Sequence, residues 1–344
     1  MKSLYLFVAF TACSIINLNA QQEAQFLNVA NNPYMVNSAA GGLGDVVQVE
    51  LSSRVQWLGY SGGPRSFLLS ANSQVKFKKG EDKVLEEFNR EDKPFFAAPT
   101  NTTGSLKHII GGKVFNDMIG PFAKTSVFGS YAIHMPFTKK LNFGAGLGIG
   151  WSNFRIDESR VKLYETDDMA YSQFLGNSSG QNILDANAGV VFYNEHFFGG
   201  FSVSQLFKND AVFDGVDTES NFNRHYFLVL KYGFDVRDNF TIEPTVVGKM
   251  AENSPISMDI GARFIFNKSI WLGIQYRTSN AVTFQLGANL IKNLYLSYGY
   301  EQSTGAVQTR NGGTHEIQLG IYLGRKRNID KEIREGAETP AEEE

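Results

Sequence analysis

The sequence predicts an all-β fold, a transmembrane antiparallel outer-membrane β-barrel of about 14 strands. Three observations lead to this prediction. Apolar and polar residues alternate along most of the chain, which is the pattern of strands with two different faces. Phenylalanine (28), tyrosine (14) and glycine (34) are abundant, yet the mean hydropathy of -0.21 resembles that of a soluble protein, as expected when half of each strand faces lipid and half a polar lumen. The links between the predicted strands alternate between short and long, as they do at the two ends of bacterial barrels.

The first 20 residues have the pattern of a secretory signal peptide. Lys2 supplies the positive start, and an apolar stretch follows from Leu4 to Ile16. This stretch is too short for a membrane-spanning helix, which needs about 20 apolar residues. We expect cleavage between Ala20 and Gln21.

Charge and cysteine content exclude several classes of protein. The net charge of -3 gives no sign of a nucleic-acid partner. The only cysteine, Cys13, lies in the signal segment, so the mature chain has no disulfide scaffold and no thiol chemistry. Lipidation of Cys13 is a weak alternative, because Phe10 fits a lipobox poorly and the apolar run continues past the cysteine.

The remaining chain divides into a periplasmic or plug-like segment over residues 21–44, a barrel over 45–325 and a flexible charged tail over 326–344. A charged, proline-containing insertion at 79–104 is assigned to the periplasm by the alternation of the links. The strands are predicted, in order, at 45–56, 65–78, 105–116, 124–136, 140–155, 182–193, 196–206, 223–234, 239–249, 257–267, 269–278, 281–290, 293–302 and 313–325.

The two kinds of link follow from these strands. From the fourth strand onward the short links are 137–139, 194–195, 236–238, 267–268 and 291–292. The longer links are 156–181, 207–222, 250–256 and 303–312, with a short 279–280 as the exception. A soluble β-sandwich gives no reason for this rhythm, whereas a barrel with periplasmic turns and outer loops does.

The stretch "FGAGLGIGW" from Phe143 to Trp151 carries four glycines at alternate positions. It does not fit a dinucleotide fingerprint, whose spacing is G-x-G-x-x-G, and it lacks the lysine of a Walker loop. It fits a strand with one apolar face and one almost bare face. A bare face suits a crowded barrel interior or a place where another chain comes close.

Charged residues fall on the predicted inward faces. A paired network is the simplest interpretation, because isolated buried charge is costly. A catalytic carboxylate pair is a weaker interpretation, since no serine–histidine arrangement accompanies these groups. A metal site at His315-Glu316 or in the acidic loop at 157–168 is also weaker, because the spacing of zinc and calcium motifs is absent. The inward charges are Glu50, Arg54, Asp185, Glu243, Asp259, Arg263, Arg277 and Glu316.

Particular residues near strand ends carry further expectations. We expect Arg54 to point inward into the charged network and Trp57 to anchor the rim at the outer interface. Trp151, Tyr298 and Tyr300 are further candidates for interfacial aromatics. Pro244 interrupts a strand pattern, which predicts a bulge there.

Several stretches, in this order along residues 25–325, resemble one family. They are Gln25-Phe26 with Asn32-Pro33 and Asn37–Gly41, "RVQWLGYSGGPRSFLLS" (Arg54–Ser70), "NDMIGPFAKTSVFGSYAIHMP" (Asn116–Pro136), Tyr276-Arg277, Tyr298-Gly299-Tyr300 and "GTHEIQLG" (Gly313–Gly320). The family is that of the PorP/SprF outer-membrane proteins of type IX secretion and gliding in Bacteroidetes. Ser38 departs from its usual proline, and the 79–104 insertion is longer than the family pattern.

The resemblance implies a non-enzymatic barrel in the outer membrane of a Gram-negative, Bacteroidetes-like cell, without a cofactor. The implied partners are outer-membrane lipids, a large secreted adhesin or its C-terminal targeting domain, and periplasmic lipoproteins of the secretion or gliding machinery. A channel or transporter for small or hydrophobic solutes is the alternative function. The family-motif and structural candidates are Arg54, Gln56, Trp57, Gly59, Pro64, Gly120, Pro121, Tyr131, His134, Pro136, Asp185, Arg277, His315 and Glu316.

Overall fold

The structure, a computed structural model, describes residues 25–43, 46–75, 106–138, 140–161, 180–209, 222–252, 254–291, 293–305 and 312–323. The signal segment, its cleavage point at Ala20 and Gln21, the 79–104 insertion and the 326–344 tail lie outside these residues. No helix in the described part of the chain is long and apolar enough to cross a membrane.

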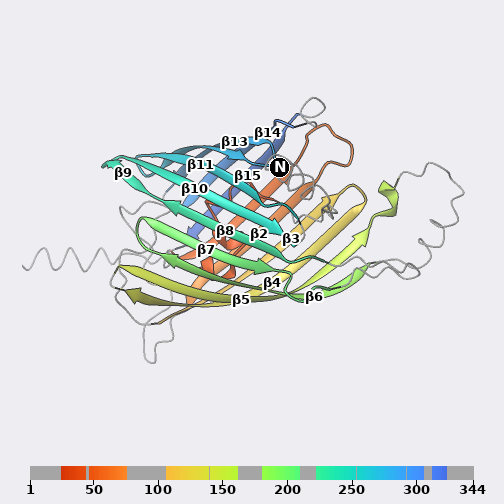
Figure 1. Ribbon diagram of the computed structural model, residues 1–344, viewed down its shortest axis with the longest axis horizontal. Helices are drawn as coiled ribbons and strands as arrows, with labels where there is room; N and C mark the ends of the chain where they lie inside the picture. Colours follow the sequence, from red (N-terminus) through yellow and green to blue (C-terminus); the bar gives the residue numbers. More distant parts are fainter. Residues whose placement is uncertain are drawn as a thin grey trace, which may run out of the picture.

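The described chain forms one closed antiparallel sheet (Figure 1). Its strands are β1 (Val47–Val55), β2 (Arg65–Val75), β3 (Lys107–Ile119), β4 (Phe122–Thr138), β5 (Leu141–Ile156), β6 (Gln181–Tyr193), β7 (Phe197–Ser204), β8 (His225–Tyr232), β9 (Phe234–Arg237), β10 (Phe240–Ala251), β11 (Ser257–Phe266), β12 (Ile270–Arg277), β13 (Ala281–Ile291), β14 (Leu294–Ser303) and β15 (Thr314–Leu323). Each strand pairs with its neighbour in sequence, except that β8 and β9 both pair with β10, and β15 returns to pair with all nine residues of β1.

The predicted fold class and strand number are confirmed. The sheet has 15 labelled strands, but β8 and β9 both pair with β10 as two parts of one strand, which leaves 15 − 1 = 14 around the barrel. Closure removes every sheet edge, as a strand structure in hydrocarbon requires.

The long–short rhythm of the links is also present. One end of the barrel carries the links 56–64, 120–121, 157–180, 205–224, 252–256, 278–280 and 304–313, and we call it the long-loop end. The other end carries 139–140, 194–196, 238–239, 267–269 and 292–293, together with the long link between β2 and β3, most of which lies outside the described residues, and we call it the short-turn end. By the rule for bacterial barrels, the long-loop end faces the outside and the short-turn end the periplasm.

Two local expectations are wrong. The predicted link between the third and fourth strands shrinks to Gly120-Pro121, because a left-handed backbone at Gly120 (φ 57) allows a tight turn. Pro244 does not sit in a bulge, since β10 keeps its register with β11 through Pro244 and Ala262. Instead, the pairing of β10 with β8 and β9 stops between Thr245 and Ile242, where proline lacks the N–H that the ladder needs. The register shift in β10 lies earlier, between Phe240 and Thr241.

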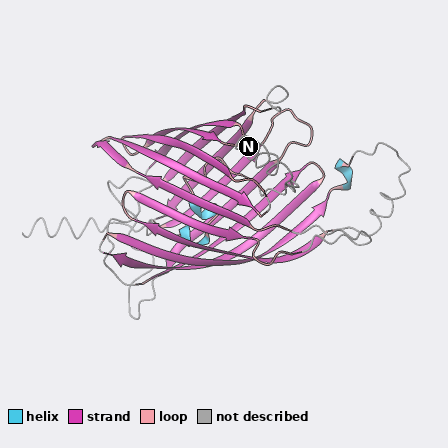
Figure 2. Ribbon diagram, viewed as in Figure 1, coloured by secondary structure: helices cyan, strands magenta, loops and turns pink. Residues whose placement is uncertain are grey.

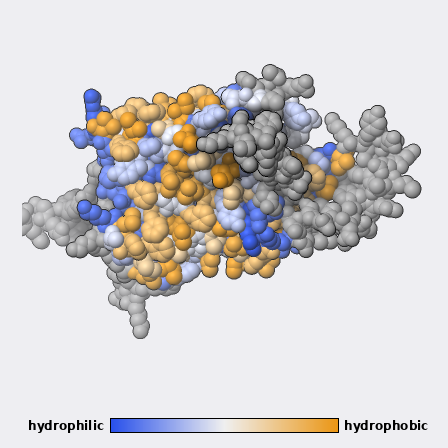
Figure 3. Space-filling model, in the orientation of Figure 1, coloured by the Kyte–Doolittle hydropathy of each residue, from blue (hydrophilic) through white to orange (hydrophobic). Residues whose placement is uncertain are grey.

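Outward faces are apolar and exposed, whereas inward faces are mostly polar and buried. Figure 3 shows hydrophobic residues over much of the face of the wall that is turned to the viewer. In β5 the outward residues Leu147 (63% exposed), Ile149 (63%) and Trp151 (45%) alternate with inward glycines, which confirms the strand interpretation of "FGAGLGIGW". An apolar band on a closed barrel is the surface that a protein presents to lipid, and the protein lies in the outer membrane.

The lumen is filled by the N-terminal part of the chain. The described residues Gln25–Leu43, which we call the lumenal segment, lie inside the barrel and are almost entirely buried. They form two short 3-10 turns, η1 (Pro33–Met35) and η2 (Ser38–Ala40), which appear as the helical turns within the sheet in Figure 2. Asn32 and Asn37 cap these turns by accepting the backbone N–H two residues on.

Candidate functional site

Side chains of the barrel wall bind the backbone of the lumenal segment. The carboxylate of Glu316 accepts hydrogen bonds from the backbone N–H groups of Leu27 (2.6 Å) and Asn28 (3.1 Å). At the other end of the segment, the Asn72 side chain accepts the N–H of Gly42 (2.8 Å). Carbonyl groups are bound in the same way, by Gln285 Nε2 on Leu27 (2.8 Å), Lys231 Nζ on Ala30 (2.9 Å), Lys113 Nζ on Met35 (2.9 Å), Ser202 Oγ on Val36 (2.8 Å) and His134 Nε2 on Ala39 (2.7 Å).

The tautomer of His134 follows from these contacts. Because a carbonyl oxygen only accepts, Nε2 carries the hydrogen that reaches Ala39. In the neutral ring Nδ1 is then an acceptor for the Tyr193 hydroxyl at 2.9 Å. The histidine therefore links the lumenal segment to two strands of the wall.

Four asparagines of the lumenal segment are fully buried and supply peptide-like hydrogen-bonding groups. Asn37 Nδ2 donates to the carbonyl groups of Val190 (3.1 Å) and Phe201 (3.2 Å), which belong to neighbouring strands β6 and β7. The others bind wall side chains, Asn28 to Glu316 and Ser297, Asn31 to Gln318 and Arg263, and Asn32 to Ser70. Tyr34 adds a hydroxyl contact with Ser130 (2.6 Å).

Inward glycines of β5 make room for the segment. A Cβ atom at Gly146 would lie 2.7 Å from both the nitrogen and the Cα of Ala39. A Cβ atom at Gly148 would lie 2.8 Å from the Ser38 hydroxyl. Such contacts are too short for real carbon atoms, so the bare face of the strand is needed where the segment passes.

An apolar cluster completes the packing of the segment. Phe26, Val29, Met35, Ala39 and Ala40 pack in one cluster with wall residues. The wall residues of that cluster are Leu68, Val191, Tyr193, Phe198, Val229 and Val247. Polar contacts thus fix the position of the segment, and burial of this apolar surface stabilises it.

A network of buried charges lies in the lumen towards the long-loop end. Asp259 accepts from Lys249 Nζ (2.8 Å) and from Arg277 Nε (2.7 Å), while Arg277 Nη1 lies 2.6 Å from Glu301. Arg54 Nη2 is 3.6 Å from the same glutamate. Deeper in the lumen, Arg263 pairs with Glu243. The ion pairs contain five of the eight expected inward charges, Arg54, Glu243, Asp259, Arg263 and Arg277, whereas Glu50 and Glu316 accept hydrogen bonds from uncharged groups.

A small cavity lies between the lumenal segment and the wall. Phe26, Met35 and Val36 line it from the segment, and Lys113, Lys124 and Asp185 are among its polar wall residues. About 50 Å³ of it is accessible to water-sized molecules, which is room for a few waters.

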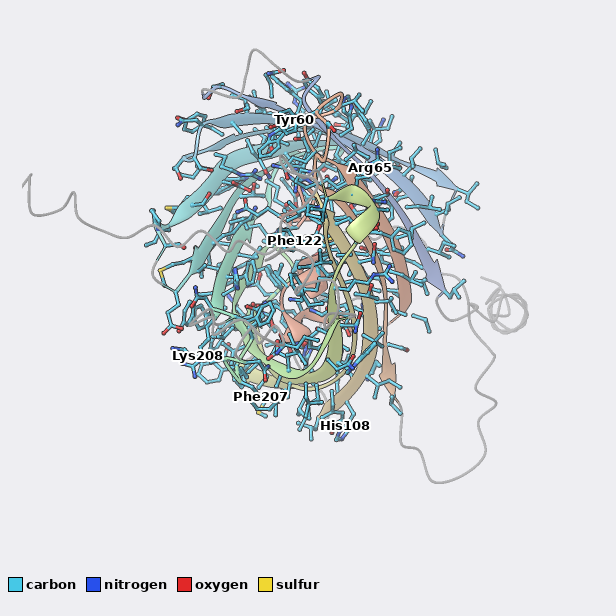
Figure 4. All side chains as sticks on the ribbon, turned by 90° about the vertical axis from the view of Figure 1, so that its right-hand side faces the viewer. Tyr60, Arg65, His108, Phe122, Phe207 and Lys208 are labelled. Carbon is cyan, nitrogen blue, oxygen red and sulfur yellow. The ribbon has the colours of Figure 1, made fainter. Side chains whose placement is uncertain are left out.

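The long-loop end forms a rim with exposed apolar side chains (Figure 4). Tyr60 and Phe207 are each 54% exposed and come from different links on this rim. Lys208 Nζ lies 2.7 Å from Glu252, which joins two of the outer links, and this hydrogen bond lowers the pKa of Glu252 from its ordinary value.

The motif candidates fall into three groups. Arg54, His134, Asp185, Arg277 and Glu316 point into the lumen and are buried. Gln56, Trp57, Gly59, Pro64, Gly120 and Pro121 meet at the long-loop end, where Gln56 N bonds Pro64 O (2.8 Å) and Gly120 N bonds Gly62 O (3.0 Å). Tyr131, Pro136 and His315 lie on the outer surface; Tyr131 contacts His108 (2.6 Å) and His315 contacts Tyr298 (2.6 Å).

The candidates therefore do not form one site. Most of the wall residues that bind the backbone of the lumenal segment were missed, namely Asn72, Lys113, Ser202, Lys231 and Gln285. The sequence did contain one feature that could have indicated a buried segment, which is the uncharged run from Gln25 to Leu43 with its four asparagines. In the described residues, no group of three or more His, Cys, Asp or Glu is placed to hold a metal ion.

Comparison with known proteins gives one family and several solved structures. The family described as type IX secretion system membrane protein PorP/SprF matches residues 18–321. No curated protein matches the chain.

The similar solved structures are barrels at low sequence identity. The Ralstonia pickettii toluene transporter TbuX is 10% identical with a TM-score of 0.44, covering 85% of this chain and 93% of that chain. The P. putida toluene transporter TodX is 12% identical (TM-score 0.44, 86% and 94% covered). The Acinetobacter baumannii outer membrane protein Omp33 is 10% identical (TM-score 0.43, 82% and 99% covered).

Proposed function

The chain belongs to the PorP/SprF family of type IX secretion system membrane proteins, and from this premise we propose that it is a non-enzymatic docking barrel. In this role it holds a large secreted adhesin, or the C-terminal targeting domain of one, at the outer face during export or surface attachment. Periplasmic lipoproteins of the secretion or gliding machinery bind its short-turn end.

The observation that carries this proposal is the filled lumen. The lumenal segment bonds to wall strands from β2 to β15, and the cavity beside it has room for a few waters only. A barrel whose interior is occupied acts through its two ends, where partner proteins can bind. The exposed apolar side chains of the outer rim support a protein partner there.

A channel or transporter for small or hydrophobic solutes is the alternative function. It requires a path through the lumen or into the wall that accepts a solute. The cavity described beside the lumenal segment offers about 50 Å³ to water-sized molecules, whereas small-molecule sites typically have roughly 300–1,000 Å³. The docking function needs no such path and is therefore favoured.

The test compares surface proteins of cells that carry different versions of the barrel. A strain lacking the gene is complemented with the wild type, with Tyr60→Ser/Phe207→Ser, or with Phe234→Ser. Phe234 is a matched control, because it is also 54% exposed but lies in β9 at the short-turn end. Surface proteins are labelled with a membrane-impermeant biotin reagent, and barrel folding is checked by heat-modifiable mobility.

We expect the deletion strain and the Tyr60→Ser/Phe207→Ser strain to lose one large surface protein, and the Phe234→Ser strain to keep it. The Tyr60→Ser/Phe207→Ser barrel should still copurify with periplasmic proteins, whereas the Phe234→Ser barrel should copurify with fewer of them. An unchanged set of surface proteins in the deletion strain would reject the docking function. A solute-dependent current through the purified wild-type barrel would favour the channel.

A further inference from the structure

The wall contacts of the lumenal segment are those of a peptide-binding site. Seven strands reach its backbone N–H and C=O groups through side chains: Asn72 in β2, Lys113 in β3, His134 in β4, Ser202 in β7, Lys231 in β8, Gln285 in β13 and Glu316 in β15. Contacts to backbone groups do not depend on the side chain of the bound residue. The wall therefore recognises the polypeptide backbone of the segment, including its two 3-10 turns.

The barrel closes without the segment. The ladder of β1 with β15 runs from Val47–Leu323 to Val55–His315 and includes no residue of the segment. The turns η1 and η2 are built from bonds within the segment, such as Ala40 N to Asn37 O (2.9 Å). If the segment leaves, water can replace its bonds to the polar wall, because large barrels commonly hold a water-filled lumen.

Side-chain contacts add a preferred register. Ala39 is fully buried and lies against Gly146, so only a small residue fits at that point. Asn37 bonds carbonyl groups of both β6 and β7, and Tyr34 reaches Ser130. The segment from Gln25 to Leu43 contains no charged residue, which suits a site where its backbone is taken out of water.

We propose that the lumen is a polypeptide-binding site, occupied in cis by the lumenal segment, that also accepts a segment of this chemistry in trans. The chemistry is that of an uncharged chain with asparagines and a pair of small residues at the position of Ser38-Ala39. The proposal that the lumen binds a polypeptide does not depend on the proposed docking function. It can be correct whether or not delivery of a surface protein requires the barrel.

The experiment starts from the full chain, so that folding does not depend on a deletion. A protease recognition sequence is inserted between Gly44 and Asp45, and the purified, folded barrel is cut there. A fluorescent peptide of residues 25–43 is then added, and its binding is followed by anisotropy. Single-channel current in planar bilayers reports whether the lumen is open.

We expect the labelled peptide to exchange into the cut barrel, to saturate, and to compete with the unlabelled peptide. Cutting and dilution should open a current that the peptide blocks. A peptide with Ala39→Leu should compete at least about tenfold more weakly, because Gly146 leaves no room for the larger side chain. A peptide with Met35→Leu, which conserves volume, should compete as well as the wild type.

Three results would overturn the proposal. In the first, the cut barrel neither exchanges the peptide within a day nor opens, so the segment is a permanent part of the fold. In the second, the barrel opens but the peptide neither binds nor blocks the current. In the third, a scrambled peptide or the Ala39→Leu peptide competes as well as the wild-type peptide, so the lumen does not bind the peptide in one fixed register.

Discussion

At Gly146 the barrel wall and the lumenal segment approach so closely that a single added methyl group would collide with backbone. Its Cβ would lie 2.7 Å from the nitrogen and Cα of Ala39. Gly146→Ala should therefore lower the free energy of unfolding by about 1–3 kcal/mol, the usual cost of overpacking. Urea unfolding in lipid vesicles, followed by tryptophan fluorescence, measures the change.

Gly129→Ala is the matched control, because its Cβ would meet nothing within 4 Å. This residue is in β4 and points away from the lumen. Alanine should be neutral or slightly stabilising there, since glycine costs conformational entropy in a strand. Equal unfolding curves for the two alanine variants would contradict the close approach at Gly146.

Asp259 carries a second prediction at the scale of single residues. Its carboxylate binds both Lys249 and Arg277, and all three groups are buried. Asp259→Asn removes the charged partner of Lys249 and one of the two carboxylate partners of Arg277, and should cost about 3–5 kcal/mol in the free energy of unfolding. Asp157→Asn, in an exposed link and paired with Arg160, should leave the urea midpoint unchanged.

If both variants unfold at the wild-type urea concentration, the lumenal ion pairs do not contribute to stability. The sequence could predict that Asp259 and Arg277 face inward, because alternation assigns each residue to a face. It could not predict that Lys249 joins them or that Arg54 shares Glu301 with Arg277. Those contacts depend on the register of β10, β14 and the closing strands, which alternation leaves open.

At the scale of elements, the position of a proline in β10 tests the pairing of the wall. Pro244 lies where pairing with β8 and β9 is interrupted, whereas Val246 pairs with Leu230 and Ile260 on its two sides. Val246→Pro would remove a ladder hydrogen bond in a strand surrounded by lipid, at a cost of several kcal/mol. It should abolish barrel assembly, as judged by heat-modifiable mobility of outer-membrane fractions.

Pro244→Val is the companion variant. It should assemble normally, because valine restores an N–H group and suits the lipid-facing side of the strand. Assembly of Val246→Pro at the wild-type level would show that the β8–β10 pairing is dispensable. The sequence predicted that Pro244 disturbs the strand, but the sequence of β10 alone could not predict that its partner strand is divided into β8 and β9.

Strand positions were the most predictable elements. The predicted segment 281–290 corresponds to β13 at Ala281–Ile291, and 140–155 corresponds to β5 at Leu141–Ile156. Both contain long runs of strict alternation. The third strand was cut short at residue 116, although β3 reaches Ile119, because Gly120-Pro121 forms a tighter turn than its composition suggested.

At the scale of the whole molecule, the sequence predicted a barrel and a periplasmic or plug-like segment over residues 21–44, but not which residues of that segment contact the wall. The bare face of β5 indicated that something comes close, and the structure shows that Ser38 and Ala39 do so. Sequence alone could not identify them, since residues about 107 positions apart (146 − 39) meet only after the barrel has closed. The glycines of β5 leave room for the lumenal segment, and the lumen that this segment fills supports the docking function proposed for this protein.

Closure itself gives the last prediction. Strand β15 pairs with β1 over nine residue pairs, from Val47–Leu323 to Val55–His315. Truncation after Gly313 removes β15 and leaves β1 and β14 with open edges, where each unpaired backbone group in lipid costs several kcal/mol. This variant should fail to reach the outer membrane, and heat-modifiable mobility of membrane fractions measures the failure. Truncation after Arg327 keeps β15 and should assemble normally. A folded barrel without residues 314–344 would show that β14 and β1 can pair directly, and the closure argument would then be wrong.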